Sequence, residues 1–241
     1  MKPTDIIHTS WLPILSPALS SPIMRELNYN VLPNISFTPH RMHIFRAFSL
    51  PVDRVRAVLI GQDPYPGPGD AIGYSFAIDR GRTKPKSLQI IEREITRSDP
   101  LHIGADTIDL LKWPEQGILM LNASLTTETG KRGSHRRYWQ DFTAHVVKEL
   151  SRVHPCTWIL WGNHAKDLDR YIMKEDKLYL TGYDRHTIEE MPISSDINYV
   201  MKAPHPMVEA YGGGGPGFYG CDHFYFVNRM LARKGQKTII W

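Results

Sequence analysis

Cysteine is scarce in this chain of 241 residues, which contains only Cys156 and Cys221. Two cysteines so far apart provide neither a disulfide framework nor the close spacing of a metal site, and they indicate a reducing compartment. The 11 histidines are also scattered, without the H-E-x-x-H spacing of a zinc enzyme. The composition therefore argues against a disulfide-stabilised secreted protein and against a zinc enzyme.

Long apolar runs are lacking as well. No stretch approaches the unbroken apolar length of a membrane-spanning helix, and the opening segment "MKPTDIIHTSWLPILSPALSS" has an acidic residue and prolines, which make a poor signal peptide. We therefore expect an intracellular protein, cytoplasmic or, in a eukaryotic or viral setting, nuclear. No repeat or low-complexity linker divides the chain, so we expect one domain over residues 1–241.

The signatures of two large enzyme classes are missing too. No G-x-S-x-G elbow of a Ser-His-Asp hydrolase occurs. The stretch "YGGGGPGFYG", residues 211–220, lacks the Lys-Ser/Thr of a phosphate-binding P-loop and the spacing of a dinucleotide fingerprint. It is more typical of a surface loop. The net charge of +4 is too small to identify a partner.

What the chain does contain is an alternation of short apolar runs and amphipathic segments. The continuous apolar runs are typical of buried parallel strands and are Val55–Gly61, Gly117–Asn122, Thr157–Gly162 and Asn198–Ala203. The segments with helical spacing are Ser87–Arg97, Tyr138–Val153, Ala165–Met173 and Asp222–Arg233. This order predicts an α/β fold, a single domain with a central four-stranded parallel sheet flanked by helices.

Polar side chains follow the ends of all four predicted strands. They are Gln62, Asp63 and Tyr65 after the first, Asn122 at the end of the second, Asn163 and His164 after the third, and His205 after the fourth. Each alone has a structural explanation, such as a turn at Asp63-Pro64 or a loop histidine between two prolines. The carboxyl ends of parallel strands meet at one edge of a sheet, however, so together these residues indicate a binding or catalytic crevice.

Motifs along nearly the whole chain resemble those of family 1 uracil-DNA glycosylases. The segments that carry the resemblance are "GQDPYPGP", "GYSFA", "LMLNASLT", "GSHRRYWQDFT", "ILWGNHA", "APHPMVEA", "FYGCDHFYFVNRML" and the final "KTIIW". The resemblance implies a monofunctional enzyme that flips uracil out of DNA and hydrolyses its N-glycosidic bond, leaving an abasic site for base excision repair. It implies no cofactor and no metal.

The resemblance also assigns roles to individual residues. It implies that Asp63 activates water and stabilises the cationic sugar, and that His205 donates a hydrogen bond to the departing uracil. Uracil would be bound by the backbone of Gln62, the ring of Phe76, the amide of Asn122 and Tyr65, whose ring would exclude the methyl group of thymine.

The same resemblance implies single- and double-stranded DNA containing uracil as the partner. Ser87, beside Lys84 and Lys86, matches a phosphate-binding serine, although the residues alone equally predict a solvated loop with Ser87 as a helix N-cap. Nothing in the sequence indicates an obligate oligomer, so we expect a monomer. Proteinaceous inhibitors of the family are a further candidate partner.

The chain departs from the family pattern at its DNA-binding positions. Pro66 replaces a histidine, Met207 stands at a phosphate-binding serine, and Glu209 occupies the position of an apolar wedge that fills the vacated base stack. Glu209 is a poor wedge against a polyanion, so Met207, Val208 or Tyr211 are the candidate substitutes. A weak wedge and the inserted "GGGGPG" predict a preference for single-stranded substrate, which avoids most of the flipping cost.

These departures leave an alternative from a different class. The chain could be a DNA-binding or accessory protein on the glycosylase fold, with its altered loop used for partner binding. The presence of Asp63 argues against this, because a binding module has no need of a carboxylate under the sugar. A nucleotide-binding enzyme that uses the glycine run is excluded by the motif chemistry described above.

Overall fold

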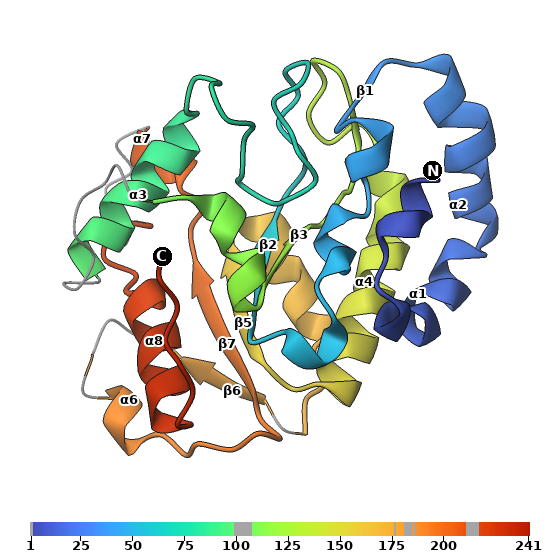
Figure 1. The fold of residues 1–241 in the computed structure, drawn as a ribbon. Coiled ribbons are helices and arrows are strands. Elements are labelled where there is room, and N and C mark those ends of the chain that lie inside the picture. The colour runs from blue at the N-terminus through green and yellow to red at the C-terminus, as the bar shows by residue number, and fades with distance from the viewer. Residues whose placement is uncertain (1, 99–107, 176, 181–184, 186, 211–216) are drawn as a thin grey trace.

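The computed structural model describes residues 2–98, 108–175, 177–180, 185, 187–210 and 217–241. Its centre is a parallel sheet in the strand order β3-β2-β5-β7-β6 (Figure 1). The strands are β2 (Ala57–Gly61), β3 (Ile118–Asn122), β5 (Thr157–Trp161), β6 (Lys177–Leu180) and β7 (Asn198–Ala203). The α/β fold and the four predicted strands are confirmed. The predicted number of strands is one too few, because β6 extends the sheet beside β7.

Helices lie on both sides of the sheet. The α-helices are α1 (Leu12–Leu19), α2 (Pro22–Glu26), α3 (Lys86–Ser98), α4 (Arg136–Val153), α5 (Asn163–Lys166), α6 (Thr187–Glu190), α7 (Met207–Ala210) and α8 (His223–Arg233). Short 3-10 segments cover Pro3–Ile6, Thr9–Trp11, Leu32–Asn34, Arg41–His43, Arg46–Ser49, Val52–Arg54, Leu110–Lys112, Pro114–Gln116 and Asp167–Tyr171, and a π-helical turn covers Leu27–Val31. Strands β1 (Phe37–Thr38) and β4 (Thr127–Glu128) form a separate antiparallel pair. No helix of the described residues is long and apolar enough to cross a membrane.

Successive side chains along a central strand point to opposite faces of the sheet and belong to two separate hydrophobic cores, as the two-residue period of a strand requires. In β2, Val58 and Ile60 pack with α1, α2 and α4 on one face. Ala57 and Leu59 pack with α3 and α8 on the other. Both faces of β2 are therefore buried, which explains why this strand appears in the sequence as an unbroken apolar run.

Strand β6 lies at the edge of the sheet, and its residues are partly buried except for Tyr179, which is exposed. Its first residue, Lys177, donates to Asp169 at 3.0 Å, and the hydroxyl of Tyr179 donates to the same carboxylate at 2.7 Å. Lys202 of β7 forms a third contact with this group, at 2.6 Å. These hydrogen bonds from cationic and hydroxyl groups hold the pKa of Asp169 below its usual value despite the opposing effect of burial.

Three of the predicted helical segments correspond to single helices, α3, α4 and α8. The fourth, Ala165–Met173, is wrong in its extent, because the structure divides this region into α5 and the 3-10 segment Asp167–Tyr171. Helices α1 and α2 have no counterpart in the sequence prediction. Their prolines lie at Pro13 and Pro22 in the first turns, where a missing N–H costs nothing, and at Pro17 inside α1.

Candidate active site

The ends of β2 and β3 and the loop that follows β2 bring an amide and an aromatic ring close together. Gly61 and Asn122 are paired in register as the last residues of these strands. A Cβ atom added to Gly61 would lie 2.5 Å from the Asn122 side-chain oxygen and 3.2 Å from the Phe76 ring. The amide and the ring therefore converge on the backbone of Gly61, at a point where any side chain would fill the space between them.

Phe76 has a backbone conformation that non-glycine residues rarely adopt, with φ of 60°. Its buried ring packs edge-to-face against Trp161 at 5.3 Å between centroids, and it lies 5.7 Å from the ring of His205. Left-handed backbone at a buried aromatic residue is costly and is found mainly where function requires it. The structure thus places Phe76 beside both Asn122 and His205, three residues to which the resemblance gave roles at the base.

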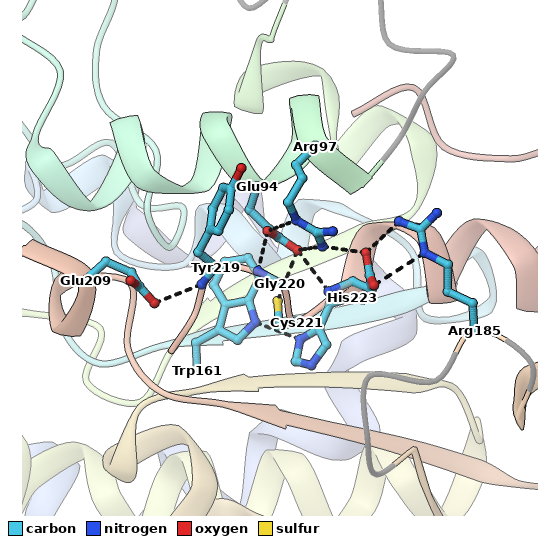
Figure 2. Close-up of polar contacts among 10 residues, drawn as sticks. Glu94, Arg97, Trp161, Arg185, Glu209, Tyr219, Gly220, Cys221 and His223 are labelled. Atoms are coloured by element: carbon cyan, nitrogen blue, oxygen red, sulfur yellow. Dashed lines mark hydrogen bonds and ion pairs between the residues drawn. The ribbon is translucent and has the colours of Figure 1, made fainter. Parts of the chain in front are cut away.

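Trp161 supports Phe76, and sequence reasoning assigned it no role. Its indole N–H donates to Nδ1 of His223 on α8 at 2.9 Å, and both side chains are buried (Figure 2). Complete burial lowers the pKa of His223 to about 3, so the imidazole is neutral and accepts at Nδ1. Trp161 and His223 lie within the segments "ILWG" and "GCDHF". Both residues thus lie in segments that resemble the family. The hydrogen bond between them could not be predicted from the sequence, because they are 62 positions apart.

We expect the substitution His223→Leu to destabilise the fold by about 1–3 kcal/mol, because the Trp161 N–H then loses its acceptor in a dry environment. Trp161→Phe in the same chain removes that donor, so the double variant should lose less stability than the sum of the two single variants. Urea unfolding of the wild type and the three variants measures this difference. Strictly additive losses would show that the hydrogen bond has no coupling energy.

Tyr65 is held at the edge of the same pocket by two oxygen atoms. Its hydroxyl donates to the Phe76 carbonyl at 3.1 Å and lies 3.1 Å from the hydroxyl of Ser87. Burial raises the pKa of Tyr65 to about 12, so the phenol stays protonated. Ser87 itself is buried and lies inside α3, which begins at Lys86. The predicted N-cap position is therefore wrong, and the Ser87 hydroxyl faces Tyr65 rather than solvent.

Asp63 is oriented by a backbone amide that the sequence did not reveal. Its Oδ2 accepts the Gly133 N–H at 2.7 Å. Burial raises the pKa of Asp63, although the Gly133 hydrogen bond and the positive charges of Arg132 and His164 oppose this rise. The carboxylate is thus a fixed but destabilised anion, which suits a group that must meet a developing positive charge.

A backbone hydrogen bond fixes the tautomer of the His205 ring. Its Nδ1 accepts the Met207 N–H at 3.1 Å, so the proton of the neutral ring is on Nε2. Burial, followed by the nearby charges of Arg132 and His164, lowers the pKa of His205 to about 4. Gly162 lies directly beneath it, because a Cβ there would be 3.0 Å from the His205 Cβ. His205 is therefore a neutral donor whose other nitrogen is already occupied.

A cavity of about 480 Å³ adjoins Asp63, and its wall includes Gln62, Ser124, Arg132 and His164. The Gln62 carbonyl accepts the Ser124 N–H at 2.9 Å, which fixes the corner after β2 to the end of β3. Among the residues that the structure describes, no three His, Cys, Asp or Glu side chains gather as a metal-binding group. Arg132 and His164 influence both Asp63 and His205. The sequence had placed His164 at the crevice without a role, and it had not indicated Arg132 at all.

Apart from Ser87 in α3, the predicted DNA-binding residues that the structure describes lie in two places. The Pro66 carbonyl accepts the Gly130 N–H at 2.9 Å and thereby joins the loop after β2 to the turn after β4. Met207, Val208 and Glu209 form the short helix α7 directly after His205. Val208 is 39% exposed, whereas the Glu209 carboxylate accepts the Tyr219 N–H at 2.9 Å. Tyr211 lies outside the described residues.

Comparison with known proteins agrees with this geometry. A protein of Dichelobacter nodosus named uracil-DNA glycosylase is 37% identical over 98% of this chain and 95% of its own length. A protein of the same name from Halalkalibacterium halodurans is 32% identical over 98% of this chain and 97% of its own. The crystal structure of a mimivirus UNG variant in complex with UGI superposes with a TM-score of 0.80 at 22% identity, covering 100% of this chain and 91% of that one. No protein-family model matches.

The fold and the site together define an α/β protein in which an amide, an aromatic ring and a neutral imidazole meet at the carboxyl edge of the sheet. A partly buried carboxylate, Asp63, lies two residues beyond Gly61. Relatives of this identity and coverage show the family to which the chain belongs. The chain belongs to the uracil-DNA glycosylase family.

Proposed function

We propose that this protein hydrolyses the N-glycosidic bond between uracil and deoxyribose in DNA and so leaves an abasic site. The observation that carries the proposal is the convergence of Asn122 and Phe76 on Gly61, beside the neutral His205. A ring and an amide that approach one point suit a base taken out of the stack, because such a base is stacked on one face and read at its edge by hydrogen bonds. The relatives described above carry the corresponding name.

Each pocket residue has a role in binding the base under this proposal. The Asn122 amide can accept from uracil N3–H and donate to O4, which a cytosine edge would not satisfy. Phe76 stacks on the ring, and the backbone of Gln62 contacts a uracil carbonyl. Tyr65 occupies the space beside C5. Because its hydroxyl is fixed by Phe76 and Ser87, the Tyr65 ring cannot easily move aside for the methyl group of thymine.

The chemistry requires a group for each of two developing charges. Cleavage gives an oxocarbenium-like sugar and an anionic uracil, so a carboxylate and a hydrogen-bond donor both lower the barrier. Asp63 meets the sugar cation and orients the attacking water, while the Nε2–H of His205 donates to uracil O2. The proton on Nε2 follows from the Met207 contact at Nδ1.

The proposal includes the partners and the setting expected from the sequence. The substrate is uracil-containing DNA, single- or double-stranded, and the protein acts as a monomer without a metal. UGI, which is bound in the mimivirus structure, is a candidate protein partner. We expect the activity in the cytoplasm or, in a eukaryotic or viral setting, in the nucleus.

Release of free uracil from single-stranded and duplex oligonucleotides tests the proposal. We expect release from both uracil substrates, none from matched thymine strands, and no change when EDTA is added. The single-strand rate should exceed the duplex rate, because an unpaired base needs little energy for flipping. DNA binding without any base release would instead identify a binding protein on this fold.

A further inference from the structure

Two carboxylates hold the chain where it returns from the His205 turn toward α8. Glu209 accepts the Tyr219 N–H at 2.9 Å, and Glu94 of α3 accepts the Gly220 and Asp222 N–H groups, each at 2.8 Å (Figure 2). Three amides within four consecutive residues are thus bound by two acidic side chains. We call residues 219–222 the return segment.

The return segment is firmly attached to α3. Glu94 is completely buried, and its charge is balanced by Arg97, which donates to it at 2.7 Å. Arg97 also bonds to Asp222 at 2.5 Å, and Arg185 bonds to the same Asp222 oxygen at 2.8 Å. A buried carboxylate with such complete hydrogen bonding resists displacement, because breaking one contact leaves a charge unpaired. The return segment therefore provides a fixed support.

Glu209 is directed toward this support by the shape of the chain at Gly217. A Cβ on Gly217 would lie 1.7 Å from the Glu209 Oε1 and 3.1 Å from its Oε2. The carboxylate consequently occupies the space that a side chain at residue 217 would need. Sequence comparison placed Glu209 at the position of an apolar wedge, but its carboxylate binds the protein's own backbone.

Helix α7 needs such an attachment. It has four residues, and the backbone bonds described at its entry are Val208 N–H to His205 and Glu209 N–H to Pro206, at 2.9 and 3.2 Å. A single helical turn is not stable alone in water. Its first end is fixed by His205, and Glu209 connects its other end to the return segment. Val208 lies between these two attachments with 39% of its surface exposed.

We infer that Glu209 is a positioning residue that holds the His205–Val208 turn in place for duplex DNA by binding the Tyr219 amide. This inference rests on the proposed uracil release. The turn presents Val208 as its exposed apolar side chain, and apolar side chains can enter a base stack. Duplex substrate needs the turn held rigidly, since the base must be forced out, whereas single-stranded substrate needs this far less.

Two substitutions at one position test the inference. Glu209→Gln keeps an acceptor oxygen for Tyr219 and should hold kcat/KM on duplex DNA within about twofold. Glu209→Leu removes the acceptor, and we expect duplex kcat/KM to fall about tenfold, the value of one good hydrogen bond, with a much smaller fall on single strands. Glu190→Leu, a similar change at an exposed site on α6, is the matched control.

Other results would overturn the inference. A rise in duplex activity for Glu209→Leu would show that residue 209 itself enters the stack. Equal losses on both substrates, or no rescue by Gln, would show a general structural role. Gly217→Ala offers a second variant, because its methyl group displaces the carboxylate. Combined with Glu209→Leu it should add no further duplex loss, and additive losses would contradict the coupling.

A hydrogen-exchange measurement separates this inference from the proposed function. The Tyr219 amide should be protected in the wild type and in Glu209→Gln, and should exchange faster in Glu209→Leu and Gly217→Ala. If the wild type releases no uracil, the proposed function fails while the exchange pattern still tests the contact. Unchanged exchange in all variants would refute the attachment whatever the activity.

Discussion

Asp63→Asn is expected to lower kcat for uracil release by about 10²–10³-fold, the cost of losing one preorganised electrostatic group. The substitution keeps the shape of the side chain and an oxygen that can accept the Gly133 N–H. What it removes is the negative charge that, in the proposed reaction, faces the sugar as positive charge develops there. Single-turnover release of uracil under saturating enzyme measures the chemical step directly, without a contribution from product release.

The same substitution should leave DNA binding and folding intact. Burial raises the pKa of Asp63, so the folded state disfavours its ionised form at neutral pH, and removing the charge should preserve or raise the free energy of unfolding. One negative charge fewer also favours contact with a polyanion. Affinity by fluorescence anisotropy and unfolding by urea are the controls. A variant that retains wild-type kcat would exclude Asp63 from the chemistry.

The raised pKa of Asp63 also determines where activity declines in acid. If the ionised carboxylate is required, kcat should fall as pH drops through a value above the ordinary carboxyl pKa of 3.8. The Asn variant should lack this decline, since it has no proton to bind at that position.

The sequence could predict those parts of the fold that are buried on every side. Strands such as β2 are covered on both faces, so burial alone selects a continuous apolar run that is visible in one sequence. Strand β6 was not predicted because an edge strand is partly exposed and does not need a continuous apolar run. Its Lys177 and Tyr179, which bind Asp169, interrupt the apolar residues. Partial burial leaves a weaker compositional signal, whatever the strand contributes to the sheet.

The candidate site divides in a similar way. Asn122 could be placed at the crevice from the sequence because it ends a predicted strand, whereas Phe76 was indicated only by the resemblance of "GYSFA" to the family. Backbone donors could not be predicted, because every residue except proline has an N–H group. The sequence therefore does not identify Gly133 as the hydrogen-bond partner of Asp63. The inferred role of Glu209 depends on its contacts with Gly217 and the Tyr219 amide. Neither residue adjoins Glu209 in the sequence, so the role follows only from the three-dimensional arrangement of the return segment.

His205→Leu is the second change for which we expect a large effect, a fall in kcat of about 10²–10³-fold. Leucine has no N–H to donate to the uracil anion and no acceptor for Met207. His205→Gln retains an amide donor and should lose less activity than His205→Leu. Measuring both variants by single-turnover release separates the loss of the donor from the loss of packing against Phe76.

The pH profile shows which form of His205 acts. Burial lowers its pKa to about 4, and the Met207 N–H occupies Nδ1, so the ring stays neutral and carries its proton on Nε2 across the physiological range. We therefore expect kcat of the wild type to show no step near pH 6.5, the ordinary pKa of histidine. A step at that pH which disappears in His205→Gln would mean that the charged imidazolium is the donor. A kcat profile without a step near pH 6.5 supports the neutral donor, because an imidazole with this pKa remains uncharged at that pH while the leaving uracil gains its charge.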